Sequence, residues 1–109
     1  MLREIKSTQR LPRQLALKVN GVGGSPSILI GGFDATLADN GTGDYTLTFA
    51  KPFARDPVVV ASCVTATCYA EIAASSATSV QILTKSNANA ATDAVFHVIV
   101  QGYDAADQT

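Results

Sequence analysis

The segment GDYTLTFA (residues 43–50) decides the fold, because its side chains alternate strictly between apolar and polar. On an extended chain, Tyr45, Leu47 and Phe49 point to one face, while an aspartate and two threonines point to the other. A period of two with one apolar face is typical of a strand that is buried on one side. The sequence therefore predicts a half-buried β-strand over this segment.

The residues on either side of this strand predict a turn and a crossover. DNGTG (residues 39–43) consists mainly of residues that tolerate turn conformations, so we expect a hairpin in which residues 33–38 pair with the strand. On the other side, Pro52 and Pro57 have no backbone N–H to donate. The stretch between them is therefore predicted to cross over rather than to pair.

Two further segments are apolar almost without interruption. Residues 57–65 (PVVVASCVT) and 95–102 (VFHVIVQG) are rich in β-branched side chains and show little alternation. Such runs are typical of strands that are buried on both faces. We therefore expect neither strand to have a solvent-facing side.

The whole chain reads as short strands separated by turns, without a helical period. The remaining strands are expected at residues 15–20, 27–30, 68–74 and 79–85. About eight short strands at this spacing indicate an all-β fold, either an antiparallel β-sandwich or a jelly roll. We expect the β-sandwich domain to span residues 14–109, and residues 1–13 to form an extended, basic N-terminal arm.

Composition agrees with one small domain. The chain has 109 residues, of which 47% are hydrophobic and only 16% are charged, so it is neither disordered nor a coiled coil. At this size the core is thin, and oligomerisation would help to stabilise it. No apolar run reaches the length of a membrane-spanning helix, and the N-terminus lacks the apolar region of a secretory signal.

Charge is distributed unevenly along the chain. Residues 1–20 hold five bases and one acid, whereas residues 21–109 hold three bases and eight acids. A basic arm ahead of an acidic body predicts docking on an acidic surface or on a neighbouring copy; the alternative is a solvated strand with scattered charges. Nucleic acid is disfavoured, because the bases are not clustered and no aromatic residue lies among them. The bases expected to make contact are Arg3, Lys6, Arg10, Arg13 and Lys18.

Reactive residues are too few for most enzyme mechanisms. His97 is the only histidine and lies in an apolar strand, so we expect it to be a hydrogen-bonded side chain of the core or of an interface. A hydrolytic triad needs a nucleophile, a base and an orienting group, and no Gly-x-Ser-x-Gly motif is present. Asp39 and Asp44 could hold calcium only weakly, because EF-hand spacing is absent. No catalytic residue, metal site or cofactor is predicted.

The two cysteines are expected to be free thiols. Cys63 and Cys68 lie five residues apart, and a zinc site would need two more ligands. Without a secretory signal, buried free thiols are the ordinary state. If Ala66 and Thr67 form the tip of a hairpin, the cysteines lie diagonally on one face of a sheet, where a disulfide would be strained.

Two blocks of sequence resemble a known class of protein. GDYTLTFAKPFARDPVVVAS (residues 43–62) and FHVIVQGYDAAD (residues 96–107) are similar to small virion structural proteins of tailed bacteriophages. The crossover also resembles that of C1q-like and H-type-lectin-like β-sandwiches, which commonly trimerise. The resemblance covers residues 30–107 and leaves residues 1–20 outside.

The resemblance implies a structural role rather than catalysis. It implies a capsid decoration (cement) protein, a homotrimer that binds the major capsid protein on the virion surface after synthesis in the host cytoplasm, without contact to nucleic acid or membrane. The alternative is a tail-fibre or receptor-binding tip that recognises host glycan. An aromatic content of 6% without tryptophan suits sugar stacking poorly and favours the first. The side chains expected to pack in the sandwich or at the oligomer contact are Phe49, Phe53, Phe96, His97 and Tyr103.

Overall fold

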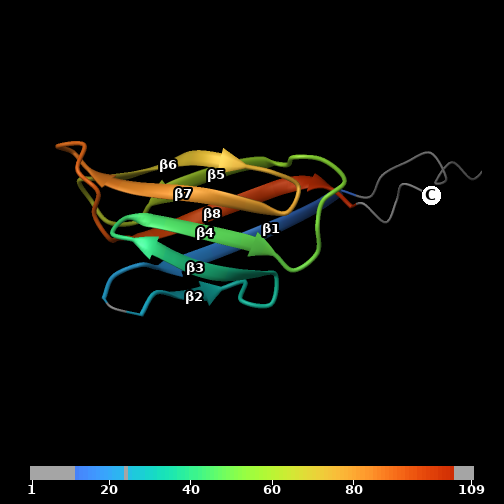
Figure 1. Ribbon diagram of the computed structural model, residues 1–109, viewed down its shortest axis with the longest axis horizontal. Helices are drawn as coiled ribbons and strands as arrows, with labels where there is room; N and C mark the ends of the chain where they lie inside the picture. The colour runs from blue at the N-terminus through green and yellow to red at the C-terminus, as the bar shows by residue number, and fades with distance from the viewer. Residues whose placement is uncertain (1–11, 24, 105–109) are drawn as a thin grey trace, which may run out of the picture.

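The computed structural model describes residues 12–23 and 25–104, which form two antiparallel sheets packed face to face (Figure 1). Sheet A has the strand order β2-β1-β8-β5, and sheet B has the order β3-β4-β7-β6. The predicted all-β sandwich is therefore confirmed. The strands are β1 (Pro12–Asn20), β2 (Ser27–Ile30), β3 (Ala35–Gly41), β4 (Asp44–Phe49), β5 (Val58–Cys63), β6 (Cys68–Ser75), β7 (Ser79–Ser86) and β8 (Val95–Tyr103).

Most of the predicted arm, residues 1–11, lies outside the described residues. Its last two residues, Pro12 and Arg13, belong to β1 and pair with Tyr103 and Gly102 of β8. The chain therefore enters and leaves the described sandwich at the same end. No helix in the described part of the chain has the length and apolar character needed to span a bilayer.

Strand β4 forms as its alternation predicts. Tyr45, Leu47 and Phe49 are buried and point toward sheet A, and β4 pairs with β3 through the predicted hairpin. Gly41 and Gly43 have φ values of +133° and +65° in this turn, which L side chains rarely adopt. Strand β4 is a central strand of sheet B, because β3 pairs with it on one side and β7 on the other.

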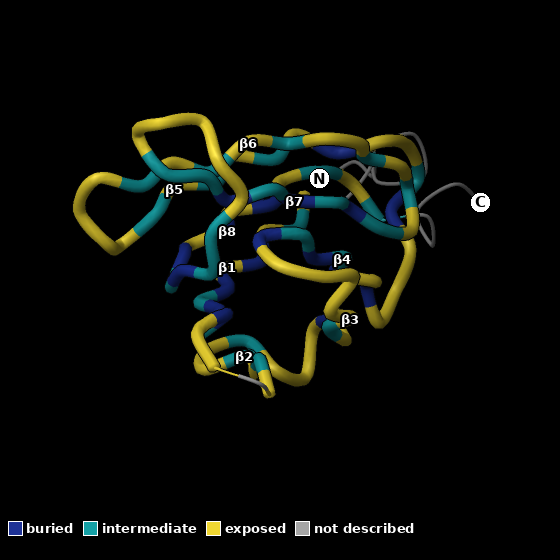
Figure 2. The backbone as a smooth tube through the Cα atoms, turned by 60° about the vertical axis from the view of Figure 1, so that its left-hand side comes forward, coloured by how far each residue is buried: buried dark blue, intermediate teal, exposed yellow. Residues whose placement is uncertain are grey.

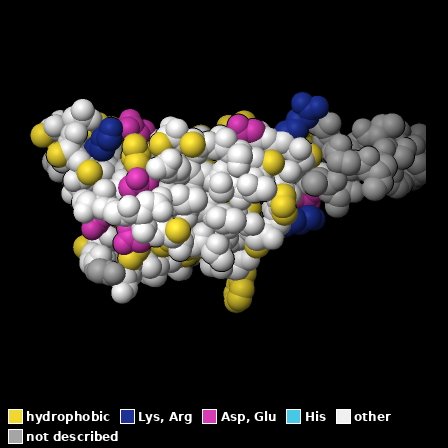
Figure 3. Space-filling model, viewed as in Figure 1, with side chains coloured by type: hydrophobic (Ala, Val, Ile, Leu, Met, Phe, Trp, Pro, Cys, Tyr) yellow, Lys and Arg dark blue, Asp and Glu magenta, His cyan; other side chains and the backbone are white. Residues whose placement is uncertain are grey.

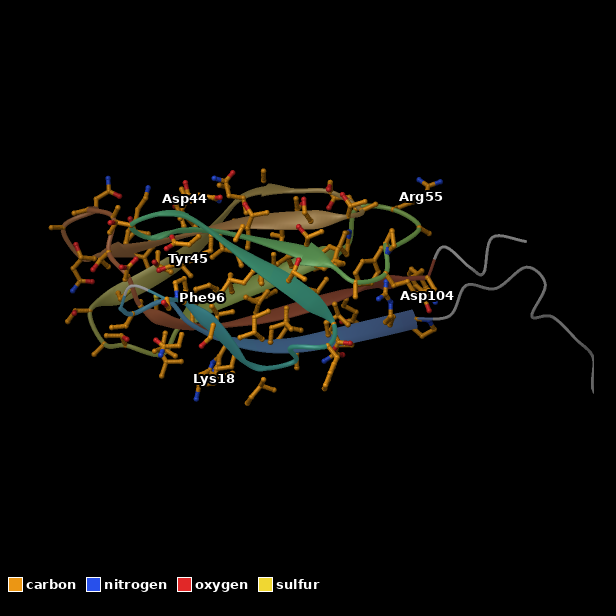
Figure 4. All side chains as sticks on the ribbon, turned by 60° about the horizontal axis from the view of Figure 1, so that its bottom comes forward. Lys18, Asp44, Tyr45, Arg55, Phe96 and Asp104 are labelled. Carbon is orange, nitrogen blue, oxygen red and sulfur yellow. The ribbon has the colours of Figure 1, made fainter. Side chains whose placement is uncertain are left out.

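The core lies between the two sheets (Figure 2). The rings of Tyr45 and Phe96 meet at its centre with their centroids 5.2 Å apart, and Figure 4 shows both side chains between the ribbons. Nearer the end at which the chain enters, Phe49 and Phe53 pack edge to face with centroids 5.1 Å apart. Aliphatic side chains fill the space around these rings; they include Leu15, Leu17, Val19, Leu47, Val80, Ile82, Val98 and Val100.

The prediction that β5 and β8 are buried on both faces is wrong. In β8 every second side chain is exposed or half-buried, and in β5 the alternating positions Val58 and Val60 are exposed. The physical reason is that a two-layer sandwich covers only one face of each sheet. The continuous apolar run therefore reflects a second apolar face that no element of the described chain covers.

The predicted crossover between Pro52 and Pro57 joins the two sheets. It carries the chain from β4 in sheet B to β5 in sheet A. Phe53 is buried on the way, and its N–H donates to the Ala77 carbonyl oxygen at 2.9 Å. The next N–H, that of Ala54, donates to the Tyr103 carbonyl oxygen at 2.8 Å.

The cysteines do not lie in one hairpin. Cys63 ends β5 in sheet A, whereas Cys68 begins β6 in sheet B. The segment between them therefore connects the two layers, because its turn leads to the opposite sheet. The premise of a diagonal pair on one sheet is wrong, although both cysteines are free thiols in this structure.

Candidate interaction surface

The outward-pointing side chains of sheet A form the candidate surface, which we call the outer face of sheet A. Ile99 lies at its centre, opposite Val60 of β5 on one side and Ala16 of β1 on the other. Val58 and Val60 keep 68% and 61% of their surface exposed, and Ile99 keeps 38%. The face comprises Gln14, Ala16, Lys18, Ile30, Val58, Val60, Ser62, His97, Ile99, Gln101 and Tyr103.

Two shallow hollows open on this face. The first, of about 210 Å³, lies between β1, β2 and β8 and is lined by Ala16, Leu17, Lys18, Ile30, His97 and Ile99. The second, of about 260 Å³, is lined by residues 54–58 of the crossover and by residues 101–103 of β8. Exposed apolar side chains beside shallow hollows are typical of a surface that a protein partner contacts on binding.

The two outer faces of the sandwich differ in chemistry. In the described residues, the strands of the outer face of sheet A carry no acidic side chain on this face and hold the cation Lys18, which Figure 4 shows pointing away from the sandwich. Arg55 and Asp56 of the crossover line the second hollow at the edge of this face. The outer face of sheet B carries Asp44 and Glu71. Figure 3 views the molecule from the side of β4 and β7, where most of the surface is white, the colour of the backbone and of side chains that are neither hydrophobic nor charged. Several side chains on this face are uncharged and polar. They include Thr46, Thr48, Ser79 and Gln81.

The structure separates the bases predicted to contact a partner. Arg3, Lys6 and Arg10 lie outside the described residues, and Lys18 is on the outer face of sheet A. Arg13 instead points inward, in phase with the buried Leu15. It is therefore engaged in the chain's own fold.

Arg13 connects several segments at the end of the sandwich at which the described chain begins. Its Nε forms an ion pair with Asp104, which follows β8, and its Nη2 donates to the Lys51 carbonyl oxygen at 2.7 Å. The guanidinium lies 3.9 Å from the centroid of the Phe53 ring, a cation–π contact. Lys51 Nζ approaches Asp104 at 3.4 Å. These contacts join β1, β8 and the crossover.

The aromatic residues and the histidine divide between core and surface. Phe49, Phe53 and Phe96 are buried between the sheets. His97 and Tyr103 point outward, and half of Tyr103 is exposed. His97 was expected either in the core or at an interface, and the expectation of a core position is wrong. Side chains of β8 alternate between inward and outward, and His97 lies between the inward Phe96 and Val98.

A buried polar cluster organises the opposite end of the sandwich. The hydroxyl of Tyr45, which is fully buried, lies 2.7 Å from Asp93 Oδ1 and 3.1 Å from the Gly21 carbonyl oxygen. The same carboxylate accepts the Gly43 N–H at 2.9 Å. Burial and the adjacent Asp93 raise the pKa of Tyr45 well above its ordinary value. The cluster thereby connects the β3–β4 turn to the loop before β8.

Replacing Tyr45 with phenylalanine should lower the free energy of unfolding at neutral pH by about 1–2 kcal/mol, because the half-buried Asp93 carboxylate loses the hydroxyl that donates to it at 2.7 Å. The substitution should also reduce the loss of stability, measured as the free energy of unfolding, between neutral and alkaline pH. The pKa of Tyr45 is raised in the folded state, so its contribution is complete below the unfolded pKa of about 10 and is lost as pH rises above it. Urea unfolding at pH 8 and pH 11 measures both effects. The half-exposed Tyr103→Phe is the control, and equal pH dependence in both variants would contradict this role.

Among residues 12–23 and 25–104, no group of three or more His, Cys, Asp or Glu side chains could hold a metal ion.

The residues that sequence reasoning missed are Val58 and Val60. Their signal was present in the apolar run of residues 57–65, which was interpreted as burial on both faces. The same run is also compatible with a strand that has one apolar face in the core and a second apolar face outside. That interpretation would have indicated a binding surface.

Comparison with known proteins adds no relative. No family model matches the chain, no curated protein matches it, and no solved structure matches it. The resemblance to virion structural proteins of tailed bacteriophages therefore stays a prediction.

Proposed function

We propose that this chain is a non-enzymatic virion structural protein, a capsid decoration protein that binds the outside of a bacteriophage head and stabilises it. The observation that carries the proposal is the apolar outer face of sheet A, centred on Val60 and Ile99. Exposed apolar patches of this kind mark interaction sites on soluble proteins. The partner proposed for this face is the assembled major capsid protein.

Charge supports this choice of partner. The outer face of sheet A holds Lys18 and no acid among the described residues, and residues 1–11 add three bases against one acid. Such a surface complements an acidic shell, and complementary charge fixes orientation and speeds association. A protein that binds only the assembled shell stabilises that shell by mass action. The mechanism is therefore mechanical, because binding across neighbouring subunits opposes their separation.

Cosedimentation with empty, expanded heads tests the proposal. Val60→Asp and Ile99→Asp place a charge at the centre of the apolar face and should weaken binding at least about tenfold. Thr46→Asp, on the outer face of sheet B, is the matched control and should bind like the unmodified protein. Circular dichroism confirms that each variant keeps its β structure. Equal binding by all three variants would exclude the outer face of sheet A as the contact.

The resemblance also implies a homotrimer, and sedimentation velocity without heads measures it. We expect Val60→Asp to leave the oligomeric state unchanged, because the proposed occupant of this face is the shell. Dissociation of an oligomer by Val60→Asp would instead assign the face to contact between copies and would overturn its assignment to the capsid.

One observation favours a tail-tip protein that binds glycan as the second candidate. Tyr103, half of which is exposed, lines the hollow of about 260 Å³ at the end of β8. An exposed aromatic ring beside a hollow suits stacking on a sugar ring. A glycan array with the unmodified protein and with Tyr103→Ala distinguishes the two candidates. A signal that Tyr103→Ala removes would favour the tail tip, and no signal would exclude it.

A further inference from the structure

We propose that Cys63 and Cys68 are a covalent modification site, at which a small-molecule disulfide such as oxidised glutathione converts the two thiols into an internal disulfide. The sulfur atoms lie 2.7 Å apart. A disulfide bond is about 2.05 Å long, so bond formation needs the sulfurs to approach by less than about 1 Å. This inference is independent of the proposed function, because it concerns the joining of the two sheets.

The fold brings these sulfurs together from opposite layers. In β5, Ala61 packs against the core and Cys63 follows it by two residues, so both point inward. In β6, Cys68 precedes Ala70 and Ile72, which also pack against the core. The two side chains therefore converge between the sheets.

Hydrogen bonds hold the connecting segment at both ends. The Val64 N–H donates to the Val95 carbonyl oxygen at 2.8 Å, and the Asn87 N–H donates to the Thr67 carbonyl oxygen at 3.1 Å. Thr67 adopts a φ of +62°, which turns the chain into β6. The segment is thereby fastened to β8 on one side and to the loop after β7 on the other, which limits how far the sulfurs can separate.

The reaction proceeds in two balanced exchange steps. The thiolate of one cysteine attacks one sulfur of oxidised glutathione, which forms a mixed disulfide and releases one glutathione thiolate. The thiol of the other cysteine then transfers its proton to that thiolate and attacks the sulfur of the first cysteine, which releases the second glutathione. The two protein thiols are oxidised, and one glutathione disulfide is reduced to two thiols. Burial and the neighbouring Cys68 raise the pKa of Cys63 to about 12, and because thiolate is the attacking form, the exchange should become faster as pH rises.

The disulfide would fasten one end of the sandwich. Cys63 pairs with Phe96 near the start of β8, whereas Arg13 pairs with Gly102 near its end. At the Arg13 end, sheet A is connected to the segment after β4 by the bond from Arg13 to the Lys51 carbonyl oxygen and by the contact of Arg13 with Phe53. At the Cys63 end, hydrogen bonds of Asp93 with Tyr45 and Gly43 already connect the sheets, and the disulfide would add a covalent bond between β5 and β6.

Intact mass and thiol titration of the unmodified protein, before and after oxidised glutathione, test the proposal. We expect a monomer that has lost two hydrogen atoms and has no titratable thiol under native conditions or in denaturant. Its melting temperature should exceed that of the reduced protein by about 5–10 °C. Two thiols that remain titratable in denaturant, or cross-linking between chains only, would overturn the proposal.

Serine variants trap the mixed disulfide. Cys63→Ser should retain one glutathione on Cys68 and Cys68→Ser should retain one on Cys63, because each variant lacks the second thiol that would release it. The double variant should melt at the same temperature with and without reductant. A change in melting temperature that reductant causes only in the unmodified protein can then be assigned to the disulfide. The mass measurement on the unmodified chain remains decisive if a variant fails to fold.

Discussion

Replacing Phe96 with alanine is expected to lower the free energy of unfolding by about 3–5 kcal/mol. Phe96 is fully buried, and its ring lies against that of Tyr45 at the centre of the core. In sheet A it pairs with Val19 on one side and with Cys63 on the other. Its removal would leave a cavity between the two sheets that the flanking strands cannot close without breaking their register.

This loss is large relative to the total stability of a small domain, which is typically about 5–15 kcal/mol. Urea unfolding followed by circular dichroism measures it. Phe96→Leu keeps most of the volume and should cost less than about 2 kcal/mol. Phe33 is fully exposed, so Phe33→Ala should change stability by less than about 0.5 kcal/mol. Similar losses for Phe96→Ala and Phe33→Ala would contradict the position of the core.

The parts of the fold that could be predicted are those governed by local chemistry. The alternation of residues 43–50 determines a half-buried strand, and the glycines after Asp39 allow the turn that precedes it. Pro52 and Pro57 interrupt pairing and mark the crossover between sheets. Each of these signals acts within a few residues, so it can be read without knowledge of distant contacts.

The exposed face of sheet A could not be predicted, because burial of a strand's second face depends on distant elements. Residues 57–63 form the same apolar run whether a third layer, a partner or water lies beyond Val58 and Val60. The described residues form two layers, so a partner on this face is a proposal that needs the topology as well as the sequence.

The candidate site was predicted only in part for the same reason. Arg13 was grouped with the arm by its charge, although its spacing from Leu15 places both on the inward side of β1. That spacing is a local signal and could have been used. Its partners Phe53 and Asp104 could not have been found in this way, because they are distant in sequence and meet it only when the crossover folds back onto β8.

The resulting molecule has two outer faces that differ in chemistry. The outer face of sheet B is polar and carries both charges of the Lys85–Glu71 ion pair, whose atoms lie 2.8 Å apart. The outer face of sheet A is apolar and, in the described residues, free of acids. A particle that covers a shell from outside needs this asymmetry, because one face must bind while the other stays hydrated. The difference between the faces, more than any single residue, is the support for the proposed decoration role.

Replacing Gly43 with alanine is expected to lower the free energy of unfolding by about 2–5 kcal/mol, through backbone strain and overpacking together. Gly43 has a φ of +65°, and an added Cβ would lie 2.5 Å from the Thr84 carbonyl oxygen and 2.8 Å from the Thr92 nitrogen. Both neighbours are backbone atoms, and their own hydrogen bonds fix them, because Thr84 N–H donates to the Gly43 carbonyl oxygen and Thr92 N–H to that of Thr84. Neither can move without breaking the joint between the β3–β4 turn and the segment before β8.

Two other glycines separate the two causes in the same urea-unfolding experiment. Gly41 has a positive φ of +133° but open space around it, so Gly41→Ala should show the strain alone, about 1–2 kcal/mol. Gly32 has neither feature, and Gly32→Ala should change stability by less than about 1 kcal/mol. If Gly43→Ala cost no more than Gly41→Ala, the backbone at Thr84 and Thr92 would have to yield freely. The cluster of Tyr45, Asp93 and Gly43 would then not fasten this end of the sandwich.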